Sequence, residues 1–440
     1  MSVRSIVIVL LLAFLGSFAF AGPQPADLAG SRLTTSSPIQ HVIIMMQENR
    51  STDNLFHGLK GADTADYGIN SKGKKIKLGP NPLANNYTLN HYHPDFIHMY
   101  DNGRMDGADL IPGDCGNHCP PNMQFKYVPL KDVQPYFDLA EQYAFGDRMF
   151  QSNQGPSYPA HQFIIAATSA PAPDTSLFDG EDTFGIDKPA GHAGCGVPSY
   201  VYTILINELG QENMPVYPCF EHQTLMDLLE NQNLTWKYYT NTLSYIWTGP
   251  NVIDHIYHGK MWANVIPSPK DVLNDISKGK LSTVTWVIPT GSSSDHPHGN
   301  NGSGPSWIAS VVNAVGNSKY WNNTAIFVTW DDWGGWYDHV KPPILNSYMY
   351  SFRVPLLVIS PYAKMGYVSE VNHDFSSIIK FVETQFNLPS LGFGDVYSDD
   401  LSDCFDFGQK PREFHTIQAP LHADYFLRQP YEPPDPNDDD

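Results

Sequence analysis

The chain has 440 residues, of which 41% are hydrophobic and 13% are aromatic, so it can bury a large core and is not an intrinsically disordered protein. Its formal net charge of −20 at pH 7 argues against nucleic-acid binding, because a phosphate backbone attracts clustered Lys and Arg side chains. A protein this acidic needs a cation to offset charge repulsion if it handles phosphate esters.

Export is predicted from the first residues of the chain. A positive residue, Arg4, precedes an apolar run over residues 5–15, and the Ala19-Phe20-Ala21 that follows has the small-x-small pattern of a signal-peptidase site. We therefore predict a cleaved signal peptide at residues 1–21 and a secreted or periplasmic protein. The alternative is an uncleaved anchor helix, because the apolar run nearly reaches the length of a short membrane span. No stable membrane span is predicted in the rest of the chain.

Three further segments are predicted. Residues 22–40 are rich in Pro, Ser and Thr, which is typical of a linker. A single large domain extends over residues 41–430. Residues 431–440 are rich in Pro and Asp and are predicted to form an acidic, disordered tail.

Within this domain, short apolar runs alternate with helical patterns. Strands are predicted to start at His41, Ser282, Ala325 and Val354, and helices over residues 132–144, from 160 onward, and over 225–231, 307–315 and 376–386. Residues 61–90 are polar and predict a surface excursion, and residues 180–218 predict a loop-rich insertion over the site. The pattern predicts an α/β fold with a mainly parallel sheet that is flanked by helices on both faces.

Five cysteines in an exported chain predict disulfides with one thiol left over. Cys115 and Cys119 are close enough in sequence to pair, and Cys195 with Cys219 is the next plausible bridge, which leaves Cys404 unpaired. The alternative is a zinc cluster, but the chain contains no C-x-x-C pair.

Polar side chains follow three of the predicted strands. The first strand leads into Glu48-Asn49, the second into Asp295-His296, and the third into Asp331-Asp332. Ligands of open α/β sheets bind beyond the carboxyl ends of the strands. We therefore expect these side chains to meet at one edge of the sheet.

The adjacent carboxylates of Asp331 and Asp332 repel each other unless they share a cation or a proton. The alternative is a pair that points in opposite directions, with one carboxylate solvated and the other capping a turn. Together with Glu48 and Asn49, the pair favours one divalent metal ion. Oxygen ligands suit Mg, Ca or Mn, whereas His296 would favour Zn or Fe, so the identity of the ion stays open.

Ser157 is the candidate nucleophile. Gly155-Pro156 predicts a turn just before it, and a helix begins within a few residues. The free N–H groups at a helix N-terminus bind a phosphoryl group and stabilise an alkoxide. The alternative is an ordinary N-cap serine. Among the 17 histidines, His296 stands out because the carboxylate of Asp295 is placed to fix its tautomer.

The segment from His41 to Phe56 resembles the opening block of the bacterial phosphoesterase family, which contains phosphatidylcholine-type phospholipases C and acid phosphatases. Further similar blocks follow in the order of that family, at residues 90–93, 102–107, 154–157, 294–297 and 329–340. The similarity extends to about Phe407, and hence over nearly the whole mature chain.

This resemblance implies a phosphoesterase catalytic domain with a core like that of the alkaline phosphatase superfamily. It implies a metal site formed by Glu48, Asn49, Asp331 and Asp332, with Ser157 as the nucleophile. Three histidines would line the phosphate pocket, namely His91, His296 and His339. His93 is an alternative to His91. His296, or another pocket histidine, would protonate the leaving alcohol.

The same resemblance separates two substrate classes. The phospholipase branch typically carries threonine where this chain has Ser157, and its members often extend into additional carboxyl-terminal domains. We therefore predict an acid-phosphatase-like hydrolase of small phosphate esters, with a phospholipase C that cleaves phospholipid head groups as the alternative. The apolar part of the insertion, residues 197–217, keeps a lipid substrate open.

Two other readings remain. A sulfatase would carry arginine where this chain has His161. A secreted, non-enzymatic metal-binding protein would bind the ion without turnover, and the intact block around Ser157 counts against it. The oligomeric state is left open.

Overall fold

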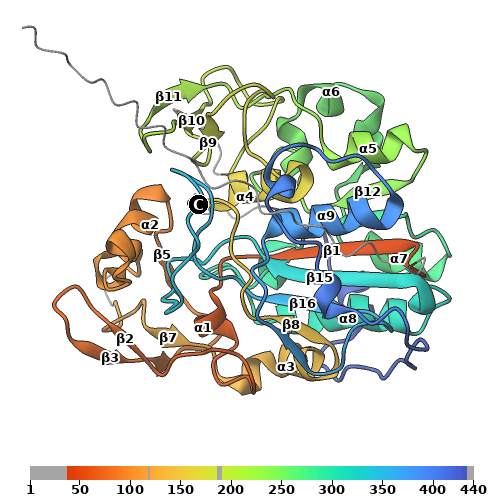
Figure 1. The fold of residues 1–440 in the computed structure, drawn as a ribbon, viewed down its shortest axis with the longest axis horizontal. Coiled ribbons are helices and arrows are strands. Elements are labelled where there is room, and N and C mark those ends of the chain that lie inside the picture. The colour runs from red at the N-terminus through yellow and green to blue at the C-terminus, as the bar shows by residue number, and fades with distance from the viewer. Residues whose placement is uncertain (1–36, 117–118, 186–190, 434–440) are drawn as a thin grey trace, which may run out of the picture. The chain divides into compact units, whose positions relative to one another are not determined.

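The computed structural model describes residues 37–116, 119–185 and 191–433 (Figure 1). The predicted signal peptide lies outside the described residues. The main sheet has eight strands in the order β13-β12-β14-β1-β15-β16-β8-β17. Their bounds are β1 (His41–Gln47), β8 (Ala144–Gly146), β12 (Trp236–Tyr239), β13 (Val265–Ile266), β14 (Val284–Val287), β15 (Thr324–Trp330), β16 (Leu356–Ile359) and β17 (Tyr367–Ser369).

The prediction of a mainly parallel sheet is confirmed. Strands β13, β12, β14, β1 and β15 are parallel neighbours, and within the described main sheet only β16 runs antiparallel to both of its partners. Every residue of β15 is buried, as are six of the seven residues of β1. Such buried and mostly apolar strands are expected where helices cover both faces of a sheet.

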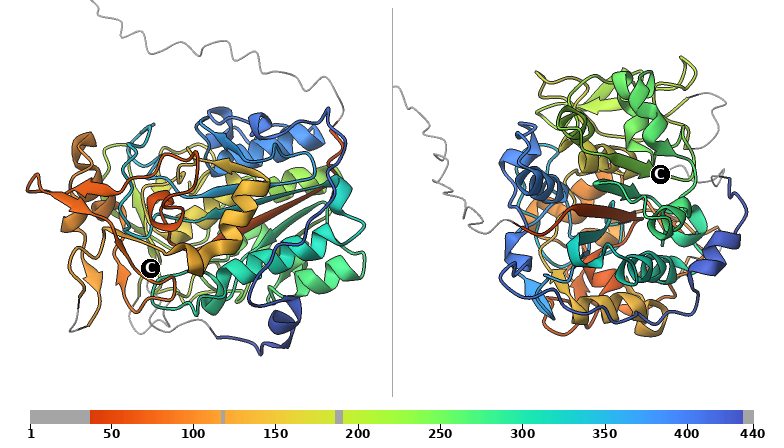
Figure 2. Two further views of the ribbon diagram at one scale, coloured as in Figure 1. Left: turned by 90° about the horizontal axis from the view of Figure 1, so that it is seen from below. Right: turned by 90° about the vertical axis from the view of Figure 1, so that its right-hand side faces the viewer.

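Helices pack on both faces of the sheet (Figures 1 and 2). One group consists of α3 (Leu130–Gln142), α7 (Asp271–Ser277), α8 (Gly304–Gly316) and α10 (Ala423–Arg428), and the other of α4 (Ser157–Ala166), α5 (Leu225–Asn231) and α9 (Phe375–Phe386). Three short helices lie outside these groups: α1 (Thr52–Leu55), α2 (His93–Tyr100) and α6 (Asp254–Tyr257). None of the described helices combines the length and apolar character needed to span a bilayer.

Helix α3 begins earlier than predicted, and its proline explains an internal break. Val133 leaves the helical conformation, with φ −127° and ψ 16°, two residues before Pro135. A proline ring clashes with the backbone of the preceding turn of a continuous helix. Pro135 therefore lies in the first turn of the helical stretch that follows the break.

The predicted surface excursion contributes a core of its own. It carries the hairpin of β2 (Tyr67–Ile69) and β3 (Lys75–Lys77) and the short strands β4 (Gly79–Pro80) and β5 (Thr88–Leu89), which pair with β7 (Lys126–Tyr127) and β6 (Gly113–Asp114). Its buried side chains pack with Trp333 and Trp336 in a second hydrophobic cluster. Because Trp333 directly follows Asp331-Asp332 and Trp336 comes three residues later, the cluster anchors the loop that carries the aspartates.

The insertion after Gly180 is only partly irregular. It contains β10 (Thr203–Ile206) and β11 (Glu212–Val216), which form a separate antiparallel sheet with β9 (Phe178–Asp179). Both predicted disulfides are present, between Cys115 and Cys119 and between Cys195 and Cys219. Cys404 is buried as a free thiol, as predicted.

One residue of the predicted linker and one of the predicted tail contact the folded unit. Ile39, assigned to the linker, is 3% exposed and belongs to the main core. Glu432, assigned to the tail, accepts hydrogen bonds from the backbone N–H of Ser292 at 2.6 Å and from its hydroxyl at 2.5 Å. A buried apolar contact and a carboxylate with two donors fix these residues to the folded unit. Residues 434–440 lie outside the described part of the chain.

Candidate active site

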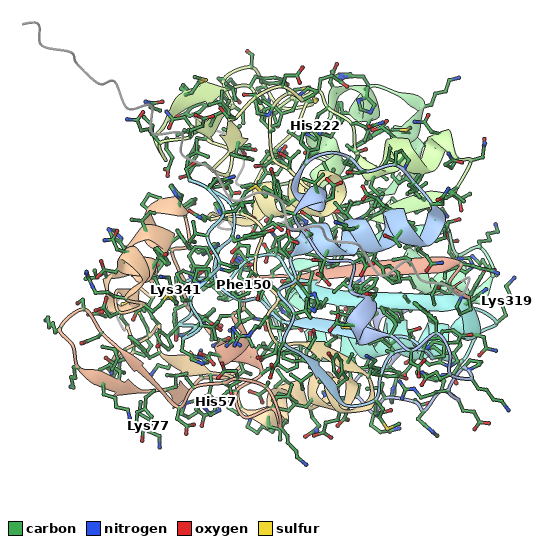
Figure 3. All side chains as sticks on the ribbon, viewed as in Figure 1. His57, Lys77, Phe150, His222, Lys319 and Lys341 are labelled. Atoms are coloured by element: carbon green, nitrogen blue, oxygen red, sulfur yellow. A yellow bond between two sulfur atoms is a disulfide. The ribbon has the colours of Figure 1, made fainter. Side chains whose placement is uncertain are left out.

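The three strands with polar ends are adjacent in the sheet, in the order β14-β1-β15. Gln47, the last residue of β1, lies opposite Trp330, the last residue of β15. In Figure 3, Lys319, shortly before β15, marks the amino-terminal edge of the sheet, and Phe150 lies beyond the opposite edge. The parallel register therefore brings Glu48-Asn49 and Asp331-Asp332 to one edge, as predicted.

Hydrogen bonds join these two motifs. The backbone N–H of Asn49 donates to Oδ1 of Asp331 at 2.8 Å, and the backbone N–H of Asp331 donates to the carbonyl of Gln47 at 2.9 Å. Asn49 has a left-handed backbone, with φ 57°, and its side-chain Nδ2 lies 3.4 Å from Oδ2 of Asp332. All four candidate ligand residues have 0% exposure. Such complete burial of three carboxylates requires compensating charge or hydrogen bonds.

Ser157 is the first residue of α4, directly after Pro156 at the N-cap position. Its hydroxyl donates to Oδ2 of Asp332 at 3.3 Å. The alternative of an N-cap serine therefore does not describe its position. The side chain instead lies where the positive end of the helix dipole meets the candidate metal ligands.

His161 belongs to the same cluster, although the sequence did not single it out as a site residue. It lies one turn after Ser157 in α4, and its Nε2 is 3.3 Å from Oε1 of Glu48. Glu48, His161 and Asp331 each offer one ligand atom, and these atoms all lie within 4.8 Å of one another. Burial lowers the pKa of His161 to about 4, although the charge of Asp331 acts in the opposite direction. The spacing of four residues from Ser157 on one helix is the signal that points to it.

These residues fit a divalent cation. Oδ2 of Asp331 is buried and accepts no hydrogen bond from any described residue. A buried carboxylate oxygen without a donor is costly unless a cation compensates it. Carboxylate oxygens with one imidazole nitrogen suit zinc, iron or manganese better than calcium.

His91 faces this cluster, whereas His93 does not. Nε2 of His91 lies 2.9 Å from Nδ2 of Asn49 and 3.5 Å from Oδ2 of Asp332. Its Nδ1 contacts the carbonyl of Leu89 at 2.7 Å, which fixes the orientation of the ring. His93 instead pairs with Glu212 of the insertion. Of the two histidines, we therefore retain His91 as the candidate.

The predicted support of His296 by Asp295 is wrong. Oδ2 of Asp295 accepts hydrogen bonds from the Tyr136 hydroxyl at 2.7 Å and from Nε1 of Trp330 at 3.2 Å, so the carboxylate is committed to the core. His296 is 6% exposed, its backbone N–H is held by the Ser294 hydroxyl, and its ring lies against Trp247. The contact with Trp247 and the held loop backbone therefore contribute to the position of this imidazole.

His339 is directed into a separate ion-pair cluster, so its predicted place in the phosphate pocket is not supported. Its Nδ1 contacts Asp53 at 2.7 Å and its Nε2 contacts Asp63 at 3.1 Å. Both ring nitrogens are thus engaged by carboxylates. Burial alone would lower the pKa of His339, but the hydrogen bond and charge of Asp53, together with Asp338, raise it to about 9.

This raised pKa predicts a pH-dependent contribution to stability. Charged His339 stabilises the folded state fully below its ordinary pKa of 6.5, and that contribution is lost as the pH rises through about 9. The difference in thermal unfolding midpoint between the natural chain and His339→Gln should therefore be largest near pH 6 and shrink by pH 10. An unchanged difference between these pH values would contradict a charged His339. His258→Gln, at an exposed histidine, provides the control.

The fold and the site define an α/β protein with a buried, acidic candidate metal centre. Residues 39–389 match the model of the Phosphoesterase family. Because this match covers most of the chain, the chain belongs to the phosphoesterase family.

Curated relatives carry phospholipase C names. A non-hemolytic phospholipase C of Pseudomonas aeruginosa is 24% identical over 85% of this chain and 58% of its own length, so the chain spans less than two thirds of that relative. Phospholipase C B of Mycobacterium tuberculosis is 24% identical over 89% of the chain and 80% of its own length. Non-specific phospholipase C6 of Arabidopsis thaliana is 23% identical over 90% and 78%, respectively.

Solved structures show a more distant similarity. A protein in the alkaline phosphatase superfamily from Vibrio parahaemolyticus aligns with a TM-score of 0.38 and 10% identity over 82% of this chain and 71% of its own. Murine ectonucleotide pyrophosphatase/phosphodiesterase 5 aligns with a TM-score of 0.41 and 8% identity over 84% and 100%. With TM-scores below 0.5, these similarities add nothing to the fold class, which the strand order establishes.

Proposed function

We propose that this chain is an exported, metal-dependent hydrolase of phosphate esters with Ser157 as its nucleophile. The observation that carries the proposal is the position of the Ser157 hydroxyl, at the N-terminus of α4 and 3.3 Å from Asp332. Membership of the phosphoesterase family supports the class of reaction. The two disulfides support export, because such bonds persist in oxidising compartments.

The proposed metal ligands are Glu48, Asn49, Asp331 and Asp332. A divalent cation bound there would neutralise phosphate oxygens and favour the alkoxide form of the serine. The chain itself supplies the orientation, since Asp332 holds the Ser157 hydroxyl as a hydrogen-bond acceptor and the N-terminus of α4 faces the incoming anionic group.

The reaction proceeds in two displacements. The Ser157 hydroxyl releases its proton to water as its oxygen bonds to phosphorus and the ester P–O bond breaks, and the leaving alkoxide takes a proton from His296 or another pocket histidine. Water then attacks the phosphoserine, the Oγ–P bond breaks, and the serine recovers its proton. We assign His91 the role of holding the bound phosphoryl group, which its contacts with Leu89 and Asp332 support.

Phosphate monoesters are the proposed substrates, and phospholipids are the second candidate. Ser157 favours the first class, since the phospholipase branch typically carries threonine there. The phospholipase C names of the relatives favour the second. Turnover of p-nitrophenyl phosphate, compared with p-nitrophenyl phosphorylcholine and phosphatidylcholine under identical conditions, separates the two classes.

Metal removal tests the proposal directly. Dialysis against a chelator should lower turnover of the best of these esters by about two orders of magnitude or more, because several kcal/mol of charge stabilisation are lost. Adding back one divalent ion should restore it, with the bound metal measured on the same sample. Failure to hydrolyse any of the three esters with Zn, Fe, Mn, Mg or Ca supplied would overturn the proposed function. Turnover of p-nitrophenyl sulfate alone would identify a sulfatase instead.

A further inference from the structure

We propose that His161 is a direct ligand of the metal ion and supplies one imidazole nitrogen to an otherwise oxygen-rich site. The inference rests on the proposed function, since it assigns a further ligand to the same ion. It points to a transition metal such as zinc, iron or manganese, rather than calcium or magnesium, as the ion for which the site is built.

The distances fit two ligands of one ion. Ligand atoms about 2.0–2.2 Å from a transition metal lie roughly 3.0–3.5 Å from each other at tetrahedral or octahedral angles. Nε2 of His161 is 3.3 Å from Oε1 of Glu48, and Asp331 contributes an oxygen to the same group within 4.8 Å. All three side chains are fully buried, so solvent does not compensate the charge of the two carboxylates.

The far side of the imidazole is held by a tyrosine of β12. The Tyr238 hydroxyl donates its proton to the carbonyl of Trp247 at 2.9 Å and accepts the backbone N–H of Gly249 at 3.3 Å. Its remaining lone pair faces Nδ1 of His161 at 3.5 Å. Because the hydroxyl proton is already committed, this contact favours a proton on Nδ1.

That tautomer leaves the lone pair of Nε2 directed at Glu48. A lone pair that faces a buried carboxylate is repulsive, and a cation between them turns the contact into coordination. Oδ2 of Asp331, which accepts no hydrogen bond from the described residues, is the second indication of a cation there. An outer partner such as Tyr238 behind a metal-bound histidine is the usual way in which proteins orient such a ligand.

Cobalt substitution tests the assignment without an activity measurement. In proton NMR of the Co²⁺-loaded protein, a metal-bound imidazole gives a strongly shifted N–H resonance that exchanges with water. We expect such a resonance in the natural chain and its absence in His161→Gln. The matched control is His91→Gln, which should retain it. We also expect His161→Gln to weaken Zn²⁺ binding by at least about tenfold in competition with a chromophoric chelator.

If His161→Gln does not fold, the spectrum of the Co²⁺-loaded natural chain still tests the inference. Bound Co²⁺ without any shifted, exchangeable N–H resonance would overturn the inference, as would a resonance that persists in His161→Gln. In either case ester hydrolysis that depends on the ion would leave the proposed function standing. Absence of both metal binding and turnover would overturn the two together.

Discussion

Replacing Ser157 with alanine is expected to abolish hydrolysis of phosphate esters while the protein stays folded. The substitution removes the hydroxyl that donates to Asp332, and no phosphoserine can then form. Removal of an enzyme nucleophile typically lowers turnover by about three orders of magnitude or more. Turnover in the metal-loaded variant is the measurement, with thermal unfolding and metal content recorded on the same sample.

Ser310→Ala is a suitable control, because Ser310 is a buried helical serine whose hydroxyl only donates to the Ser306 carbonyl. This variant should keep near-normal turnover. Acid quenching of the natural enzyme during turnover should trap a phosphorylated chain, and the label should be missing in Ser157→Ala. Turnover by Ser157→Ala within tenfold of the natural rate would contradict the role of the serine.

Replacing Arg353 with methionine is expected to destabilise the fold more than most substitutions. Its guanidinium is fully buried and donates to both carboxylate oxygens of Asp338, at 2.9 and 3.1 Å, and to Asp147 at 3.3 Å. It also lies 3.6 Å from Asp53. Removing one partner of a buried ion network leaves uncompensated charge and costs about 3–5 kcal/mol.

Urea unfolding of the two chains measures this difference in free energy. Arg104→Met is the control, because Arg104 is 62% exposed and pairs with Asp101 at the surface, so its loss should change stability little. If Arg353→Met unfolds at the same urea concentration as the natural chain, the network does not contribute as described. The cluster also raises the pKa of Asp338 through burial, although Arg353 counteracts this.

The clustering of the candidate metal ligands could be predicted from the sequence, because each candidate follows the end of a predicted strand. Strands β1 and β15 are mostly apolar, and in a parallel sheet their carboxyl ends lie at one edge. The identity of the residues that follow was therefore enough to bring Glu48 and Asp331 together. The disulfide pairing could also be predicted, because the chain contains only five cysteines.

Side-chain direction was not accessible in this way. Asp295 and His296 are neighbours in sequence, yet the Asp295 carboxylate binds Tyr136, which arrives from α3 on a distant part of the chain. His339 follows the aspartate motif closely but turns to Asp53. In both cases a long-range partner decides the rotamer, and no local pattern encodes that partner.

For His161 the position on the helix could be predicted, but its role could not. Its spacing from Ser157 on α4 was visible, but a histidine inside an apolar helix is more often a core residue than a ligand. The assignment of His161 as a ligand depends on Glu48, which directly follows β1 and lies more than a hundred residues earlier in the chain.

The central position of β1 in the sheet affects the solubility of the chain before it has folded. Val42 pairs with Val284 on one side and Ala325 on the other, so both neighbours of β1 are made long after β1 itself. Until then the segment His41–Gln47 has two open edges and an almost wholly apolar surface. Such segments are prone to aggregate during slow, long-range assembly. A chain cut short before β14 should therefore accumulate as insoluble material, however well its remaining helices form.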